Sequence, residues 1–223
     1  MWNSGWESIF KSTDWGQYPP EELIRFVARN FFSRDDRNTI KILEVGCGTG
    51  ANIWFLCREG FDTYGIDGSR TAVMKCEDKL QREGYTASLT VGDILNLPYE
   101  KDMFDAVIDN QCIYSNSMAD SKQIFKEVKR VLKKGGLFYS RTFGTRTYGF
   151  GLGETLPGEP HTFISHKEGA LRKDYGIIRY MDEDEIKSVY GNYFKINSQD
   201  YLIRSVQQGK HEILEWIIIA SNE

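Results

Sequence analysis

The sequence contains no apolar run long enough to cross a membrane. Its longest candidate, Ile213 to Ala220, falls far short of the roughly 20 residues that a membrane-spanning helix needs. The first residues of the chain also lack a basic segment followed by an apolar stretch, so no secretory signal is expected. We therefore expect a cytoplasmic protein without a membrane partner.

Cysteine is scarce, and the chain has no excess of basic residues. The four cysteines are widely spaced and form no Cys-x-x-Cys pair, which favours reduced thiols over disulfides or zinc. A formal net charge of −4 and a pI near 5.5 argue against a dedicated nucleic-acid-binding protein, so no nucleic-acid partner is expected. The three histidines form no cluster with acids at metal-ligand spacing, and we expect no bound metal.

The size and composition of the chain indicate one globular domain spanning residues 1–223. Hydrophobic residues make up 40% of the sequence and charged residues 27%. Residues 1–38 are expected to form an N-terminal arm and a first helix. This helix begins near Pro19-Pro20, where proline and the acids that follow suit a first turn, and its apolar residues from Leu23 to Phe31 recur at helical spacing.

Strand and helix patterns alternate through the middle of the chain. Strand-like apolar segments are expected at residues 39–45, 62–67, 87–91, 104–109 and 137–142. Helical patterns separate them, and the most amphipathic one, at 120–134, ends at Gly135-Gly136, a common stop signal. This alternation predicts an α/β fold with a parallel sheet, right-handed crossovers and helices on both faces.

Residues 144–180 interrupt the alternation with many glycines and aromatic residues. A long irregular insertion inside a compact domain is usually functional, so we expect a lid-like segment here. A helix at residues 181–190 and two strands at 194–198 and 212–220 complete the chain. They bring the expected number of strands to seven.

Three glycines at alternate positions, Gly46, Gly48 and Gly50, follow the first strand and precede a helix. Glycines let the backbone turn sharply and approach a ligand closely, and a strand-to-helix loop is a common cofactor site. The spacing differs from the Gly-x-Gly-x-x-Gly of dinucleotide sites, and Glu44 is a poor neighbour for a phosphate. The loop favours a cofactor that has positive charge and no phosphate, such as S-adenosylmethionine.

The segment from Glu44 to Gly50, Glu-Val-Gly-Cys-Gly-Thr-Gly, resembles the first motif of class I S-adenosylmethionine-dependent methyltransferases. Further segments resemble the later motifs of this family in the same order: Gly65-Ile66-Asp67, Gly92-Asp93-Ile94, Phe104 to Asp109 and Val131 to Gly136. The resemblance implies a Rossmann-like, seven-stranded, mostly parallel sheet with an antiparallel last strand. It also implies S-adenosyl-L-methionine as cofactor and S-adenosyl-L-homocysteine as product.

The resemblance further implies which residues bind the cofactor. Asp67 would accept hydrogen bonds from the ribose hydroxyls, and Asp93 would hold the adenine amino group while Ile94 packs on the ring. A helix cap for Asp67 and an ordinary turn for Asp93 are the alternative interpretations. Aromatic residues around Tyr18 would contact the sulfonium or pack on the first helix. The complete expected set is Glu44, Gly46, Cys47, Gly48, Gly50, Asn52, Asp67, Gly68, Asp93, Ile94, Asp109, Asn110 and Tyr18.

The acceptor is expected to be a small molecule that is methylated at oxygen. The fourth strand ends in Asp109-Asn110-Gln111-Cys112, without the prolines of the Asn/Asp-Pro-Pro-Tyr motif of amino methyltransferases that act on adenine or glutamine. An oxygen nucleophile benefits from a base, and His161 and Tyr114 are the candidate catalytic residues, beside His166 and Asp109. A surface hydrogen bond for His161 and core packing for Tyr114 are the competing explanations.

Other functions fit parts of the pattern. A nicotinamide-dependent oxidoreductase is disfavoured because the dinucleotide glycine spacing and a Tyr-x-x-x-Lys pair are both missing. A non-catalytic S-adenosylmethionine-binding module and an N-methyltransferase of a small amine are the alternatives to O-methylation. The aromatic residues before the first helix and the later insertion resemble methyltransferases encoded with bacterial surface-polysaccharide enzymes. The sequence does not indicate the oligomeric state.

Overall fold

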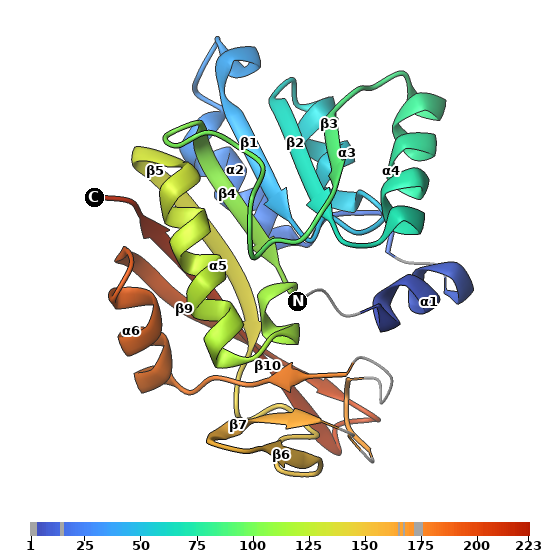
Figure 1. Cartoon of the computed structure of the whole chain (residues 1–223), viewed down its shortest axis with the longest axis vertical. Helices are drawn as coiled ribbons and strands as arrows, with labels where there is room; N and C mark the ends of the chain where they lie inside the picture. Colours follow the sequence, from blue (N-terminus) through green and yellow to red (C-terminus); the bar gives the residue numbers. More distant parts are fainter. Residues whose placement is uncertain (1–3, 14–15, 165, 167, 172–175) are drawn as a thin grey trace.

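The main structural element is a seven-stranded sheet (Figure 1). The structure, a computed structural model, describes residues 4–13, 16–164, 166, 168–171 and 176–223. The sheet consists of β1 (Lys41–Val45), β2 (Asp62–Asp67), β3 (Ser88–Val91), β4 (Phe104–Asn110), β5 (Leu132–Phe143), β9 (Lys195–Val206) and β10 (His211–Ser221). Their order is β3-β2-β1-β4-β5-β10-β9, with β1 to β5 parallel and β10 antiparallel to both of its neighbours. The predicted Rossmann-like sheet with an antiparallel last strand is confirmed.

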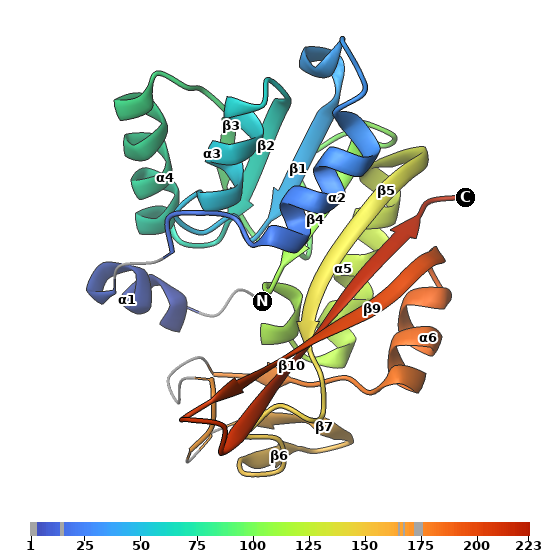
Figure 2. The same ribbon diagram turned by 180° about the vertical axis from the view of Figure 1, so that it is seen from behind.

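Helices cover both faces of this sheet (Figures 1 and 2). The helices are α2 (Glu21–Phe31), α3 (Ala51–Arg58), α4 (Arg70–Glu83), α5 (Met118–Val131) and α6 (Glu183–Gly191). Side chains of successive strand residues point to opposite faces, so Ile42 of β1 packs with α2 and α3 while Leu43 and Val45 pack with α5 and α6. Each of these fully buried side chains contributes about 1.5–3 kcal/mol, which fixes the strand at the centre of the fold.

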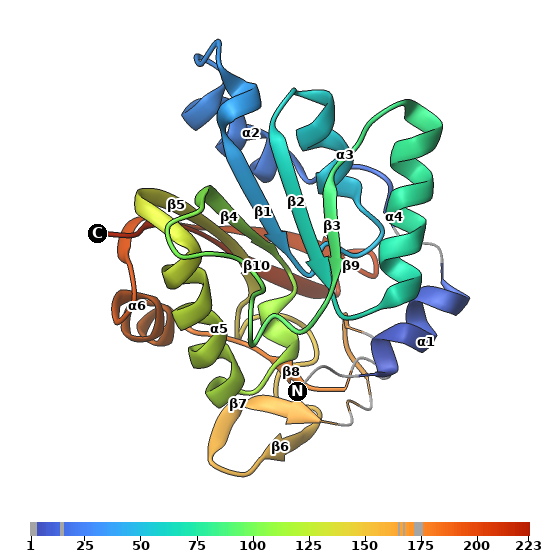
Figure 3. The ribbon, with the colours of Figure 1, turned by 45° about the horizontal axis from the view of Figure 1, so that its top comes forward.

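The expected N-terminal arm contains a helix, α1 (Gly5–Ser12). It lies beside the end of α4 where the carboxyl ends of β1 and β2 meet (Figure 3). Ile9 and Phe10 are its buried residues, and Trp6 lies on the same side because positions three and four residues apart share a helix face. The N-terminal arm is therefore helical over residues 5–12.

The fifth helix ends earlier than expected. The sequence favoured a helix to residue 134, whereas α5 ends at Val131 and β5 already begins at Leu132. Asn222, near the C-terminus, explains the difference, because its Nδ2 donates to the carbonyl of Leu132 (2.9 Å) and its own carbonyl accepts from Gly135 N (2.6 Å). These long-range bonds replace the glycine stop that local sequence predicted.

Residues 144–180 are only partly irregular, because turns and bends in their described part are joined by short strands. They form a small sheet of three strands, β6 (Glu154–Leu156), β7 (Glu159–Ile164) and β8 (Ile178–Arg179), all antiparallel. This sheet lies beyond the carboxyl ends of the main strands (Figure 1). Phe163 and Ile178 pack against Tyr114, which anchors the small sheet beside the end of β4. The insertion is thus a folded subdomain next to the expected site.

The remaining elements agree with the predicted order, and most strand bounds lie within two residues of those expected. Two short 3₁₀ helices, η1 (Arg37–Thr39) and η2 (Ile113–Ser115), precede β1 and follow β4. Strand β9 differs most, because it is a 12-residue strand that continues well beyond the expected end at residue 198 and pairs with β10 along a long hairpin. Among the described helices, none has the length and apolar character needed to span a membrane.

Candidate functional site

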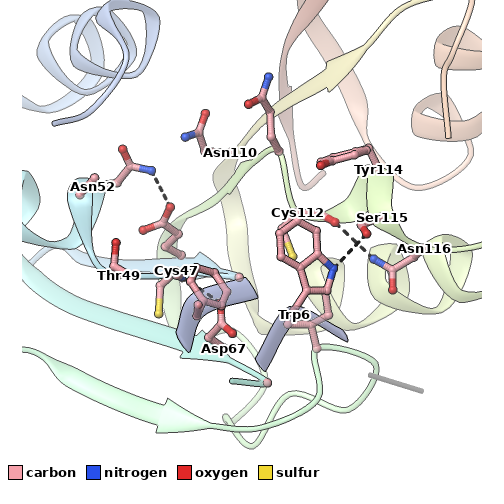
Figure 4. Close-up of a pocket in the computed structure, with 18 of the residues that line it drawn as sticks. Trp6, Cys47, Thr49, Asn52, Asp67, Asn110, Cys112, Tyr114, Ser115 and Asn116 are labelled. Carbon is pink, nitrogen blue, oxygen red and sulfur yellow. Dashed lines mark hydrogen bonds between the residues drawn. The ribbon is translucent and has the colours of Figure 1, made fainter. Parts of the chain in front are cut away.

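A cavity of about 320 Å³ opens at the carboxyl ends of β1, β2 and β4 (Figure 4). A volume of this size lies in the range of small-ligand and cofactor sites. Parallel strands place their carboxyl ends at one edge of the sheet, so residues from distant parts of the sequence meet there. The cavity is lined by Trp6, Phe10, Glu44, Gly46, Cys47, Gly48, Thr49, Ala51, Asn52, Asp67, Gly68, Asp93, Ile94, Asn110, Gln111, Cys112, Tyr114, Ser115, Asn116, Phe143, Leu171 and Arg204.

Two of the three loop glycines form part of this lining. Gly46 has φ +68°, and a Cβ placed there would lie 2.1 Å from the sulfur of Cys112. Gly48 has φ +52° and its N–H donates to Oδ2 of Asp67 (2.9 Å). The loop therefore needs glycine both for its left-handed backbone and for its close approach to the strand end beside it.

The third glycine has a different role. Gly50 does not line the cavity; it is the N-cap of α3, with φ +82°. A Cβ at this position would lie 2.2 Å from the sulfur of Cys76 in α4. Gly50 thus lets α3 and α4 pack closely, and the structure gives no support to its expected contact with a cofactor.

Glu44 is a buried acid in the wall of the cavity, 2% exposed. Asn52 Nδ2 donates to its Oε1 (2.5 Å), while Oε2 has no hydrogen-bond partner among the described residues. Burial raises the pKa of Glu44 to about 8, although the bond from Asn52 lowers it, and the nearby charges of Asp67 and Asp109 raise it further. At neutral pH the protonated form therefore predominates until a positive charge enters the cavity.

Asp67 lies at the end of β2 and lines the same cavity. Burial raises the pKa of its carboxyl, and the N–H groups of Ser69 and Gly48 oppose this rise by donating to its two oxygens. The helix-cap role that was an alternative for Asp67 belongs to Ser69, whose Oγ accepts from Ala72 N (3.1 Å). Each carboxylate oxygen can accept a second bond, so Asp67 is suited to a pair of hydroxyl donors.

Asp93 and Ile94 follow β3 at the adjoining part of the cavity wall. Oδ1 of Asp93 accepts from Leu95 N (3.0 Å), which is the turn interaction that the sequence left as an alternative. Ile94 is 8% exposed and presents an apolar surface beside it. Cys47, Asn52, Gly68 and Asn110 from the expected set also line the cavity.

Asp109 and Tyr18 were expected at the cofactor, and the structure places both elsewhere. Asp109 is fully buried: Oδ1 accepts from the N–H groups of Cys112 and Ile113, and Oδ2 accepts from Ser140 Oγ (2.6 Å). It holds the turn that carries Asn110 into the cavity. Tyr18 is 76% exposed and makes an edge-to-face contact with Trp54, outside the cavity. Trp15, of the same aromatic segment, lies outside the described residues.

Helix α1 forms one side of the cavity through Trp6 and Phe10. Trp6 Nε1 donates to Ser115 Oγ (3.2 Å), a contact visible in Figure 4. Glu7 holds the helix in place, because its carboxylate accepts from the hydroxyls of Ser69 (2.6 Å) and Thr71 (2.5 Å) at the start of α4. These bonds lower the pKa of Glu7 to about 2. A negative charge at a helix N-terminus is also favoured by the helix dipole.

The part of the cavity around Tyr114 is lined by aromatic and polar residues. Tyr114 lies in η2 and stands edge-on to Phe143, with 4.9 Å between ring centroids. Ser115 and Asn116 follow it, and Leu171 and Arg204 complete this end from the insertion and from β9. These residues surround the volume next to Asn110, so this end is suited to hold a second ligand beside a bound cofactor.

The structure does not bring His161 or His166 to the cavity. His161 Nδ1 lies 2.6 Å from Oε2 of Glu185 and 4.0 Å from Asp182, the two residues that form the capping box of α6. A base must lie within hydrogen-bond reach of the proton that it removes, and His161 does not line the cavity in which that proton would lie. His166 is buried beside the hydroxyl of Tyr180 (3.2 Å), and burial lowers its pKa.

The sequence spacing did not reveal that His161, Asp182 and Glu185 come together. In the described part of the chain, they are the group of acids and histidines whose geometry could hold a metal ion. Their contacts are accounted for by the start of α6, where Asp182 accepts from Glu185 N (2.8 Å) and Glu185 bonds His161.

Sequence reasoning missed a large share of the lining. Trp6 and Phe10 carried a detectable signal, because they lie at helical spacing in residues 5–12. Arg204 and Leu171 carried none, since only the three-dimensional fold brings β9 and the insertion to the ends of β1 and β4. The missed lining residues are Trp6, Phe10, Thr49, Ala51, Cys112, Ser115, Asn116, Phe143, Leu171 and Arg204.

The fold and the cavity together are those of the class I methyltransferase fold: a seven-stranded sheet with an antiparallel end and a glycine loop facing an acid at the end of β2. Residues 36–168 match the family model described as a methyltransferase domain. This match covers more than half of the chain, and the chain belongs to that family. It contains a methyltransferase domain.

Relatives and solved structures agree with this assignment. The chain is 26% identical over 185 residues to the tRNA N(3)-methylcytidine methyltransferase of Schizosaccharomyces pombe, covering 77% of this chain and 58% of that protein. It is 31% identical over 154 residues to the malonyl-[acyl-carrier protein] O-methyltransferase of Priestia megaterium, covering 67% and 49%. A SAM-dependent methyltransferase from Methanosarcina mazei has the same fold, with a TM-score of 0.72 at 21% identity and coverage of 92% and 98%. The chain spans about half the length of these curated relatives.

The family implies S-adenosylmethionine as methyl donor, and unpartnered buried atoms test whether the cavity suits it. Oε2 of Glu44, Oδ1 of Asn52 and Oδ1 of Asn110 are buried and lack a hydrogen-bond partner among the described residues. The two amide oxygens are acceptors, as is Oε2 of Glu44 once it is ionised, and leaving such groups unpaired costs about 1–3 kcal/mol each. A ligand with an ammonium group would satisfy them, so the residues present fit an amino-acid cation.

Proposed function

We propose that the protein methylates an oxygen atom of a small-molecule acceptor. The observation that supports this most is the shape of the cavity: one continuous volume runs from Glu44 to Tyr114, and α1 and the insertion bound it. Trp6, Phe143 and Leu171 give its acceptor end an apolar lining. Such a site is suited to surround a small ligand rather than to grip a long surface.

Bound S-adenosylmethionine would supply a methyl group activated by a positively charged sulfur. The residues that would hold it are Glu44 and Asn110 at the amino-acid portion, Asp67 at the ribose, and Asp93 with Ile94 at the adenine. Glu44 would ionise against the incoming positive charge, and this charge pairing would orient the donor. Because methyl transfer needs alignment and exclusion of water, the walls formed by α1 are expected to matter as much as any single polar group.

Tyr114 is the residue that we propose to act on the acceptor. Its side chain lines the acceptor end of the cavity and is fixed by the edge-on ring of Phe143, 4.9 Å away between centroids. Its phenolic Oη is suited to hydrogen-bond the acceptor oxygen and to direct it toward the donor end.

The first test of the function is ligand binding. S-adenosylhomocysteine should raise the melting temperature of the protein, because a ligand that binds only the folded state stabilises it by mass action. Absence of any shift at saturating ligand would contradict S-adenosylmethionine as donor. A panel of hydroxylated small molecules, small amines and bulk tRNA should then be compared for methyl transfer from labelled donor, and preferential labelling of an amine or of tRNA would refute O-methylation of a small molecule.

The role of Tyr114 is tested with the acceptor so identified. Tyr114→Phe should lower kcat by about tenfold or more while leaving the affinity for S-adenosylhomocysteine unchanged. His161→Gln is the matched control, since His161 lies outside the cavity and bonds Glu185. We expect wild-type turnover from this control. Equal turnover of Tyr114→Phe and wild type would remove Tyr114 from the mechanism.

A further inference from the structure

The outer edge of β9 has no neighbouring strand in the part of the chain that the structure describes. Residues 200–205 of this strand are all exposed, whereas residues 213–218 of β10, paired along its inner edge, are all buried. The exposed segment is apolar at its centre: Tyr201, Leu202 and Ile203 expose 55%, 39% and 38% of their surface. An edge of this kind offers its free N–H and C=O groups to another strand.

We propose that this edge is the contact surface for a second copy of the chain, with the two β9 strands pairing antiparallel about a two-fold axis at Leu202. The two seven-stranded sheets would then form one continuous sheet. This inference concerns the surface of β9 and is independent of the acceptor that the enzyme uses.

The charge pattern of β9 selects this register. Two copies of one strand that pair about an axis perpendicular to the sheet place side chains of the same face opposite each other. A residue of one copy can therefore face only a residue of the other copy whose number differs from its own by an even number. With Leu202 on the axis, Asp200 of each copy faces Arg204 of the other. A shift by two positions either way places Asp200 and Arg204 opposite uncharged residues, because their partners become Leu202, Ser198 or Val206.

The apolar residues fit the same register. Leu202 would face Leu202, and Tyr201 of each copy would face Ile203 of the other, so three neighbouring apolar pairs lie between two ion pairs. Aromatic and branched pairs directly opposite across antiparallel strands are stabilising, as are opposite charges. The contact is isologous, which closes the assembly at two copies instead of allowing a fibre.

Arg204 is available for this pairing. The structure gives it no hydrogen bond or ion pair with any described residue, and Asp200 is bonded only by Ser198 Oγ (2.9 Å). Arg204 also lines the acceptor end of the cavity. The proposed dimer contact therefore begins directly beside the candidate active site.

The test is a charge exchange followed by sedimentation or light scattering of the full chain. Wild type should have the mass of a dimer. Asp200→Arg or Arg204→Asp places like charges opposite each other and should raise the dimer dissociation constant on the order of tenfold or more. The double exchange, D200R with R204D, restores opposite charges in this register only and should recover the dimer. Glu77→Arg, an exposed acid on α4 at the other end of the sheet, is the matched control and should not change the mass.

Three results would overturn the proposal. The first is a wild-type protein that has the mass of a monomer even at the highest concentration at which it does not aggregate. The second is a dimer dissociation constant that neither single reversal changes. The third is a double-exchange variant that stays monomeric although its melting temperature equals that of the wild type. If a reversal variant does not fold, Leu202→Lys provides a second route, because it places two lysines on the axis. Amide hydrogen exchange adds a local readout: protection of residues 200–204 should rise with protein concentration in wild type and not in Leu202→Lys.

Discussion

The buried carboxyl of Glu44 makes cofactor binding depend on pH. Its pKa is raised to about 8 in the ligand-free protein because burial disfavours the charged form. A positively charged amino group in the cavity would favour the ionised form, so the ligand should bind the deprotonated protein and release a proton from Glu44. Affinity for S-adenosylhomocysteine should therefore rise as pH rises toward 8.

The size of the effect follows from the population of the competent form. With a pKa of about 8, about one molecule in ten is ionised at Glu44 at pH 7, and about one in a hundred at pH 6. The apparent dissociation constant should thus fall by nearly tenfold between these pH values, which corresponds to about 1.4 kcal/mol. Close to one proton should be released for each ligand bound at neutral pH.

Calorimetry measures both quantities. Titrations with S-adenosylhomocysteine in buffers of different ionisation enthalpy give the affinity and the number of protons released. The pH range is limited to between about pH 6 and about pH 7.5, because an α-amino group such as that of the ligand itself titrates near pH 8. Glu44→Gln should bind more weakly at the upper end of this range, with little dependence on pH. Glu7→Gln is the control: the pKa of Glu7 is about 2, so this variant should keep the wild-type pH slope even if loss of the α1 contact weakens binding.

Protein stability gives an independent check on the same group. The pKa of Glu44 is higher in the folded protein than its ordinary value of 4.5, so its contribution to stability is complete below about pH 4.5 and is lost as pH rises through about 8. Glu44→Gln should consequently raise the melting temperature of the ligand-free protein more at alkaline than at mildly acidic pH. An affinity that does not change between pH 6 and pH 7.5 in wild type would refute the reasoning about Glu44.

Two further substitutions test the framework of the site. Gly46→Ala should destabilise the protein by about 2–5 kcal/mol in denaturant titration, since it combines a left-handed backbone with a Cβ only 2.1 Å from the sulfur of Cys112. Gly60→Ala is the control, because Gly60 has φ +86° and a Cβ there would meet open space, so this variant reports the cost of the left-handed backbone alone. Equal losses of stability from both variants would exclude a steric clash with Cys112 as a cause. Arg141→Met should cost about 3–5 kcal/mol, because it leaves the buried Glu215 carboxylate without its guanidinium partner. Replacing both residues by Met should recover much of that loss, and a double variant as unstable as the single one would argue against the ion pair as the cause.

Local sequence patterns were sufficient for the parallel part of the fold. The buried strand β1 has apolar residues on both faces, and the glycine loop after it requires conformations that other residues adopt only with strain. These features depend on neighbours within a few positions in the chain. For the same reason, Gly46, Gly48 and Asp67 could be assigned to a common site before their geometry was known.

Features decided by distant residues were predicted poorly. The end of α5 depends on Asn222, about ninety positions away, so local stop signals placed it three residues too late. His161 looked like a candidate base because it lies in the insertion, yet its imidazole faces Glu185 at the start of α6. Asp109 similarly ends the expected strand, but buried donors from Cys112 and Ser140 occupy its oxygens.

The sequence by itself determined the fold class and the glycine loop opposite Asp67, because turn geometry and strand periodicity are short-range properties of the chain. Only the tertiary structure decided which residues line the rest of the cavity. Trp6 and Ser115 meet across 109 positions, and Arg204 comes to the same cavity from an edge strand near the C-terminus. Contacts of this kind arise from the packing of whole elements, and no local pattern encodes them.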